Sequence, residues 1–183
     1  LKGRAIPLCW ASCRKYVYDG HRSRNAFEES LLLVLRQMIP LHVKVILLAD
    51  RGFGRTELGR FCQRHHFDYV IRIQGKVRVK FNDQDVRLDQ YPVRKGTSER
   101  LNDVIYRSRS RHPLAQHVII RWKKGLPAKR DEPWYLMTSL PAEAGWTAIR
   151  TSDLYGQRMA IEQLFRDGKN KRHGWSLRDT GLT

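Results

Sequence analysis

The chain has 183 residues, of which 35 are Lys or Arg and 18 are Asp or Glu, so its formal net charge at pH 7 is +17. A hydrophobic content of 41% with five Trp and seven Tyr excludes a disordered basic tail and indicates a globular protein with a core. The charge favours a polyanionic partner such as nucleic acid, although passive RNA binding would produce the same excess. No apolar run approaches the ~20 residues of a membrane span, and no membrane partner is expected.

The first part of the chain alternates strand-like apolar runs with segments of helical periodicity. The run VKVILLA over residues 43–49 is continuous and rich in β-branched residues, which predicts a strand covered on both faces. Strands and helices that alternate in this way are typical of an α/β fold. The predicted elements are a strand over 4–10, a helix from Ser23 or Asn25 to Met38, a strand over 43–49, a helix over 56–66 and a strand over 68–73.

The pattern changes at Gly75, where alternating β-rich segments separated by turns replace the α/β order. We interpret residues 75–141 as a β-rich insertion, which divides an α/β core into a first part over 1–74 and a helical part over 142–183. The predicted strands of the insertion cover 76–81, 86–91, 117–122 and 134–140, and the predicted helices behind it cover 142–149 and 152–168.

The cysteines suggest a reduced compartment. Cys9, Cys13 and Cys62 form neither a CxxC pair nor an even framework, which favours a cytosolic protein over a secreted one. Cys62 with His65 and His66 resembles a set of metal ligands, but no second ligand pair accompanies them. We therefore interpret these three residues as structural.

Four residues near the end of the chain stand at the spacing of one helix face. Tyr155, Arg158, Glu162 and Lys169 are three, four and seven residues apart, so at about 100° per residue they form one narrow stripe. A carboxylate framed by a phenol and two cations can hold a metal ion beside phosphates. Arg158 and Glu162 are also an ordinary i, i+4 pair, and most such pairs are solvated surface ion pairs.

A second carboxylate, Asp50, follows the most hydrophobic run of the chain. Open α/β sheets bind ligands at the carboxyl ends of their strands, although an Asp in this position is often only a helix cap. A helix packed on the same sheet would bring Glu162 beside Asp50. Two carboxylates that share Mg²⁺ or Mn²⁺ are what two-metal phosphoryl transfer requires.

The strings that contain these residues resemble a known family. LLADRGFGRTEL and the Tyr-x2-Arg-x3-Glu-x6-Lys spacing are similar to DDE transposases of bacterial insertion sequences, specifically the insertion-sequence-four family with its Y-R-E-K signature. GRAIPLCW, WYLMTSL and FRDGKNKRHGWSLRDT resemble the family too, so the similarity covers nearly the whole chain. It implies an RNase H-like catalytic core with a β-rich insertion ahead of the catalytic Glu.

The resemblance also implies roles for individual residues. Asp50 corresponds to the second catalytic Asp and Glu162 to the catalytic Glu, and both would hold Mg²⁺ or Mn²⁺. Trp134 corresponds to a Trp that stacks on a flipped base during hairpin processing, and a core Trp is an equally good interpretation. The remaining DNA-contacting candidates are Tyr155, Arg158 and Lys169 on phosphates, with Lys171 and Arg172 as further backbone charges or as part of a solvated helix end.

The implied activity is that of a cut-and-paste transposase, which cleaves DNA strands at transposon ends and transfers them to a target. Its partner would be double-stranded DNA, bound by a homodimer in a bacterial cytoplasm at the nucleoid. The family's first catalytic Asp is expected ahead of Leu1, because the loop context of Asp19 does not suit it. This chain is therefore expected to be an inactive piece of the parent, incomplete at its N-terminal strands. A non-catalytic basic nucleic-acid-binding module (a decayed remnant) and an RNase H-like nuclease without strand transfer remain as alternatives.

Overall fold

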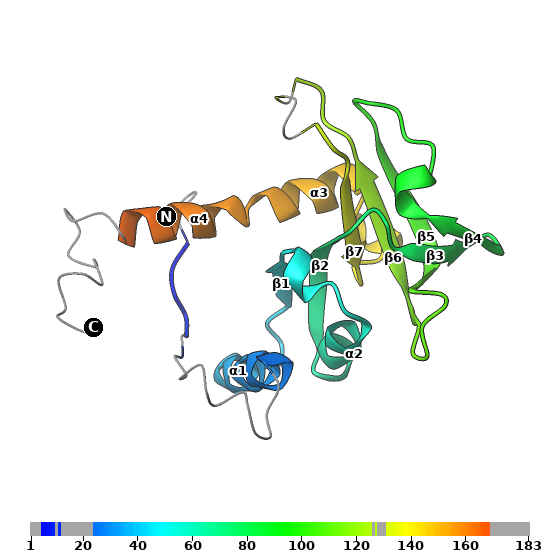
Figure 1. Ribbon diagram of the computed structural model, residues 1–183. Helices are drawn as coiled ribbons and strands as arrows, with labels where there is room; N and C mark the ends of the chain where they lie inside the picture. Colours follow the sequence, from blue (N-terminus) through cyan, green and yellow to red (C-terminus); the bar gives the residue numbers. More distant parts are fainter. Residues whose placement is uncertain (1–4, 10, 12–23, 126, 128–130, 169–183) are drawn as a thin grey trace.

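The computed structural model describes residues 5–9, 11, 24–125, 127 and 131–168, and these residues form one mixed α/β sheet structure (Figure 1). The strands are β1 (Val45–Ala49), β2 (Phe67–Ile73), β3 (Arg78–Phe81), β4 (Gln84–Arg87), β5 (Ser98–Tyr106), β6 (Leu114–Arg121) and β7 (Trp134–Thr138). The helices are α1 (Arg24–Met38), α2 (Thr56–Arg64), α3 (Ala148–Gly156) and α4 (Met159–Gly168), with short 3₁₀ turns η2 (Arg51–Phe53), η3 (Leu88–Gln90) and η5 (Ala142–Ala144).

The seven strands lie in the order β1-β2-β7-β6-β5-β3-β4. Only β1 and β2 are parallel, and α2 is the crossover between them; the other strands pair antiparallel. The strands of the 75–141 segment continue the same sheet, because β7 lies between β2 and β6. This arrangement is compatible with the predicted RNase H-like core. The division into 1–74, 75–141 and 142–183 stays a prediction.

Two clusters of apolar side chains cover the two faces of the sheet. On one face Leu58 and Phe61 of α2 pack with the odd-numbered residues of β2, which include Tyr69 and Ile71. On the other face Tyr155 of α3 packs with Val70, Ile119, Leu136 and Leu140. The alternation of side chains along β2 thus divides its residues between α2 and α3. Among the helices of the described part, none combines the length and apolarity needed to cross a bilayer.

One glycine fixes how closely α2 approaches the sheet. A Cβ at Gly59 would lie 2.3 Å from Cδ2 of Leu114, so any larger residue would push the helix outward. α1 is held differently, since the buried guanidinium of Arg55 hydrogen-bonds Glu28 and Glu29 of α1 at 3.0 and 3.3 Å. Much of the predicted apolar face of α1 stays open, with Met38 63% exposed.

The N-terminal part of the prediction is wrong in two respects. Residues 5–9 have irregular backbone rather than strand structure, in keeping with Pro7, which lacks the N–H that a ladder needs. The strand predicted over 43–49 forms as β1 but lies at the sheet edge, where only Ala49 is fully buried. Val45 and Leu47 pack against the cluster on one face and Ile46 and Leu48 against the cluster on the other, so both faces of β1 are covered, but only in part.

The later elements also differ from prediction. The longest strand, β5, was not predicted, because a bulge between Leu101 and Val104 breaks its alternation. The helix predicted over 142–149 is only η5, which Gly145 ends with a left-handed φ of 76°. The helix predicted over 152–168 is two helices, with α3 beginning at Ala148 and the break falling at Gln157 and Arg158.

Candidate active site

Asp50 lies directly after β1, where the chain turns into η2. Its Oδ1 accepts a hydrogen bond from the backbone N–H of Gly52 at 3.0 Å, so the carboxylate caps the short helix. The residue is exposed at the sheet edge. The cap uses only Oδ1, so Oδ2 is left for a metal ion. The capping and catalytic interpretations of Asp50 are therefore compatible.

Tyr155 brings α3 to the same end of the sheet. Its side chain is 3% exposed and packs edge-to-face on Trp134, with ring centroids 5.3 Å apart. Burial raises the pKa of the phenol, the charges of Arg158 and Arg72 lower it, and the charge of Asp50 raises it. Asp50 and Tyr155 are therefore within electrostatic reach of one another, although 105 positions separate them in the sequence. The phenol is neutral at pH 7 and can donate a hydrogen bond.

Arg158 lies in the helix break, and Glu162 lies in the first turn of α4. The Arg158 guanidinium donates to Oε1 of Glu162 at 3.0 Å, and the Glu162 side chain is 46% exposed. The backbone tightens to 3₁₀-type bonding at the break, since the amides of Gln157, Arg158, Ala160 and Ile161 each donate to the carbonyl three residues earlier. The predicted single helix is wrong, because Tyr155 lies on α3 and Glu162 on α4, which projects from the sheet in Figure 1. The Arg158 guanidinium still lies 5.8 Å from the centroid of the Tyr155 ring and pairs with Glu162, so these three residues are neighbours.

The metal-ligand candidates remain Asp50 and Glu162. Among the described residues, no group of three or more His, Cys, Asp or Glu is placed to hold a metal ion. Two oxygen-donor carboxylates suit Mg²⁺ or Mn²⁺ chemically, and the pairing of Asp50 with Glu162 stays a prediction. Cys62 is buried, and burial raises the pKa of its thiol to about 12, which keeps it protonated.

Trp134 begins β7 between a core residue and a cation. One side of its ring meets Tyr155, and the Lys123 ammonium lies 4.6 Å from the ring centroid. The ring is only partly buried, so both interpretations of Trp134, base stacking and core packing, remain open. The other three predicted DNA contacts, Lys169, Lys171 and Arg172, lie outside the described residues.

Two residues of this region were missed by sequence reasoning. Arg72 lies on β2 with its side chain on the Val70 side of the sheet, and it donates to Oε1 of Glu132 at 2.5 Å. Arg51 of η2 donates to the same oxygen. Burial lowers the pKa of Arg72, and the charge of Arg51 lowers it further. A charged residue inside the apolar run of β2 was the available signal for Arg72.

Several buried polar atoms here have no hydrogen-bond partner in the described part of the chain. They are the Tyr155 hydroxyl, Nε of Arg72 and Nε of Arg158. Arg72 interacts electrostatically with both other residues, so the three belong to one neighbourhood. Buried polar groups normally find partners, and donors left open beside an exposed carboxylate suit an anionic ligand.

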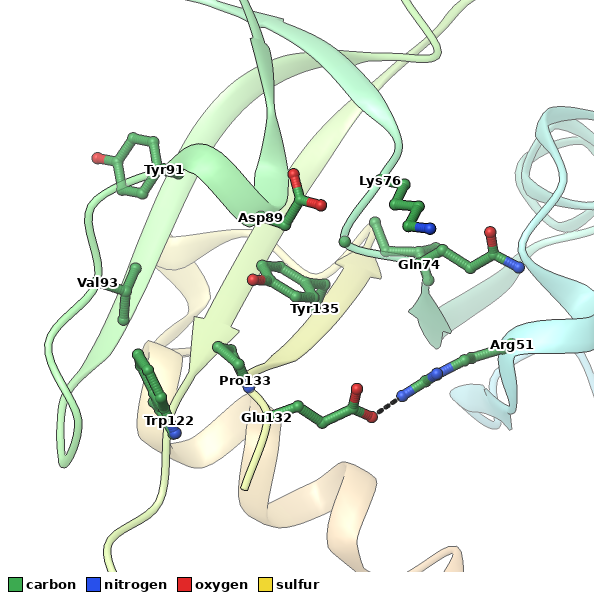
Figure 2. Close-up of a pocket in the computed structure, with 12 residues that line it drawn as sticks. Arg51, Gln74, Lys76, Asp89, Tyr91, Val93, Trp122, Glu132, Pro133 and Tyr135 are labelled. Atoms are coloured by element: carbon green, nitrogen blue, oxygen red, sulfur yellow. Dashed lines mark hydrogen bonds and ion pairs between the residues drawn. The ribbon is translucent and has the colours of Figure 1, made fainter. Parts of the chain in front are cut away.

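A pocket of about 550 Å³ opens beside Arg51 (Figure 2). Arg51 and Glu132 point toward one another at its rim, and Tyr135 of β7 lies on its wall. The charged wall residues and the aromatic rings give the pocket both polar and apolar surface. Its other lining residues are Ile73, Gln74, Gly75, Lys76, Asp89, Tyr91, Val93, Trp122 and Pro133.

Comparison with known proteins now adds to this geometry. The sequence profile of the family described as Transposase DDE domain matches residues 16–181, which is most of the chain. A comparison with curated proteins gives no match. The matched segment contains the exposed Asp50 at the end of β1, the buried Tyr155 and the basic residues around them. The chain belongs to the transposase DDE domain family.

Proposed function

We propose that the protein is the catalytic domain of a cut-and-paste DNA transposase of the insertion-sequence-four type, with Asp50 and Glu162 as catalytic carboxylates. The family match is the observation that carries this proposal. The net charge of +17 supports a DNA partner, and the exposed carboxylate at the end of β1 supports a site for hard cations. The protein would act as a homodimer on DNA in a bacterial cytoplasm, at the nucleoid.

The residues around Asp50 have complementary tasks in this proposal. Asp50 and Glu162 would hold Mg²⁺ or Mn²⁺, which when bound activates the attacking oxygen and stabilises the leaving oxygen of a phosphoryl transfer. Tyr155 and Arg158 of the Y-R-E-K signature, with Lys169, would hold the phosphates of the transposon end. Trp134 would receive a base displaced from the duplex, and Lys171 and Arg172 would follow the DNA backbone.

A non-catalytic nucleic-acid-binding function is the second candidate. Glu162 is paired with Arg158 at 3.0 Å, and no three-carboxylate cluster is formed among the described residues. A third carboxylate upstream of Leu1 stays a prediction, as does inactivity of this chain by itself. The two candidates differ in one observable, which is metal-dependent DNA cleavage.

The test uses the full-length protein with a supercoiled plasmid that carries its element, in the presence of Mg²⁺. Asp50→Asn and Glu162→Gln are each expected to abolish strand cleavage and to leave DNA affinity within about threefold, since removing a metal ligand affects chemistry more than phosphate contacts. Asp83→Asn is the matched control, because Asp83 lies in the exposed β3–β4 turn, with its side chain 94% exposed. Cleavage by either site variant would falsify the catalytic assignment and leave the binding function.

A further inference from the structure

Glu132 joins two arginines that come from separate elements. One oxygen of its carboxylate, Oε1, accepts from Arg51 of η2 and from Arg72 of β2, the latter at 2.5 Å. Arg51 directly follows Asp50 in the chain. Figure 2 shows the Glu132 side chain reaching across from the segment ahead of β7 to Arg51. A single acidic side chain therefore links the turn after β1 to the neighbouring strand β2.

The two guanidinium groups are less exposed to water than the Glu132 carboxylate, so they depend more on a bound anion than Glu132 depends on them. The Arg72 side chain is 22% exposed and that of Arg51 is 43% exposed, whereas the Glu132 side chain is 54% exposed. The charge of Arg51 lowers the pKa of Arg72, which means that the two cations repel one another. Nε of Arg72 has no partner in the described part of the chain. Without an anion between them, the pair would be unfavourable.

A phosphate satisfies the same donors as a carboxylate. Guanidinium groups bind both through parallel N–H···O contacts, and a phosphate offers more acceptor oxygens than one carboxylate. The Glu132 side chain lies on the solvent side of the arginines and can leave by rotating its own bonds. Arg51, which follows Asp50 in the chain, and Arg72 on β2 therefore form an anion-binding site, and in the free protein the Glu132 carboxylate occupies it.

We propose that Glu132 occupies, in the free protein, the position that a DNA phosphate takes on Arg51 and Arg72. The proposal rests on the proposed function, because that function supplies DNA as the polyanion near Asp50. Glu132 then weakens DNA binding until a phosphate displaces it. Displacing Glu132 costs the same free energy for every duplex. A DNA that makes few other contacts is therefore released, whereas a transposon end that makes many contacts stays bound.

The experiment measures binding of a fluorescein-labelled random-sequence duplex to the full-length protein by anisotropy over a range of salt concentrations. Glu132→Gln is expected to lower Kd about five- to tenfold, the effect of one freed charged contact, and to steepen the salt dependence by up to about one unit. Asp83→Asn changes the net charge equally in the exposed β3–β4 turn, where Asn suits the φ of 61°. It is expected to change Kd less than twofold, so the excess over this control is the Glu132 effect.

A second background shows whether the effect passes through the arginines. In a protein that carries both Arg51→Gln and Arg72→Gln, the additional change Glu132→Gln is expected to add nothing beyond the Asp83→Asn control. Glu132→Gln binding no tighter than the control, or weaker than the unaltered protein, overturns the proposal, because Glu132 would then be neutral or would position the arginines for DNA. If the unaltered protein does not bind duplex DNA at all, the proposed function itself is overturned. Retained cleavage by Asp50→Asn affects only the catalytic assignment.

Discussion

Replacing Tyr155 by Phe tests two effects of its hydroxyl separately: its effect on the stability of the fold and its contribution to DNA affinity. The Tyr155 ring is 3% exposed, and its hydroxyl makes no hydrogen bond of normal geometry among the described residues, although the Arg158 guanidinium lies close enough to lower the pKa of the phenol. A buried group that loses its water without gaining a partner costs about 1–3 kcal/mol. Tyr155→Phe keeps the ring and its edge-to-face contact with Trp134, so the variant is expected to be more stable by about 1 kcal/mol. For a chain of this length, that raises Tm by about 2–4 °C.

Tyr106 supplies the matched control. It is 1% exposed, and its hydroxyl donates to the Gly54 carbonyl at 2.8 Å. Tyr106→Phe removes the same atom from an equally buried ring but takes from the Gly54 carbonyl the shorter of its two hydrogen bonds and leaves the one from Arg107 at 3.3 Å. The variant is expected to lose about 1 kcal/mol of stability, which is opposite in sign to the Tyr155 change.

The two variants are compared by thermal and urea unfolding, and by binding to duplex DNA. If the Tyr155 hydroxyl is reserved for a phosphate, Tyr155→Phe is expected to weaken DNA binding about five- to tenfold while raising Tm. Tyr106→Phe is expected to leave DNA binding unchanged. A loss of stability in Tyr155→Phe equal to that in Tyr106→Phe would refute the reasoning, since the hydroxyl would then have a partner within the protein.

Two further predictions concern α1 and Trp134. Arg55→Ala is expected to cost about 3 kcal/mol and to speed hydrogen exchange throughout α1, because it removes the buried guanidinium that pairs with Glu28 and Glu29. Arg24→Ala removes only the exposed second partner of Glu28 and is expected to cost less than about 1 kcal/mol; equal costs would contradict the role of burial. Trp134→Ala is expected to spare first-strand nicking and to impair hairpin formation, and to lose less stability than the about 3–5 kcal/mol that truncating a fully buried aromatic residue costs. Separate rates of nicking and hairpin formation, together with thermal unfolding, test this, and a stable variant with normal hairpin formation would exclude both interpretations of the ring.

The sequence predicted best those elements whose pattern is decided locally. The helix over 56–66 and the strand over 68–73 form as α2 and β2, since each has a strong apolar period of its own. β5 was missed because its bulge moves residues out of alternation, and Asp103 there has a φ of 52°. The break after Gly156 was also not predicted. A period count shows neither departure, and the bulge depends on how β5 pairs with β6.

The candidate site was predictable only in part for a similar reason. Asp50 was found because it ends an apolar run, and its electrostatic interaction with Tyr155 supports bringing α3 to that end of the sheet. Arg72 was overlooked, since one charge within a strand ordinarily points to solvent. Its partner Glu132 is 60 positions away in a connecting segment, so only the folded sheet brings the two together.

The unpredicted charged residues of the candidate site have one electrostatic origin. Arg51, Arg72 and Arg158 place three cations near a half-covered edge of the sheet, where burial strengthens their mutual repulsion. A protein selected for stability alone would replace Arg72 by an apolar residue, because a buried charge rarely repays its desolvation. Local departures from such rules are expected where function requires them. The Glu132 bridge follows from this surplus of positive charge, and a polyanion that reached Asp50 would both replace Glu132 on the arginines and offer an acceptor to the Tyr155 hydroxyl.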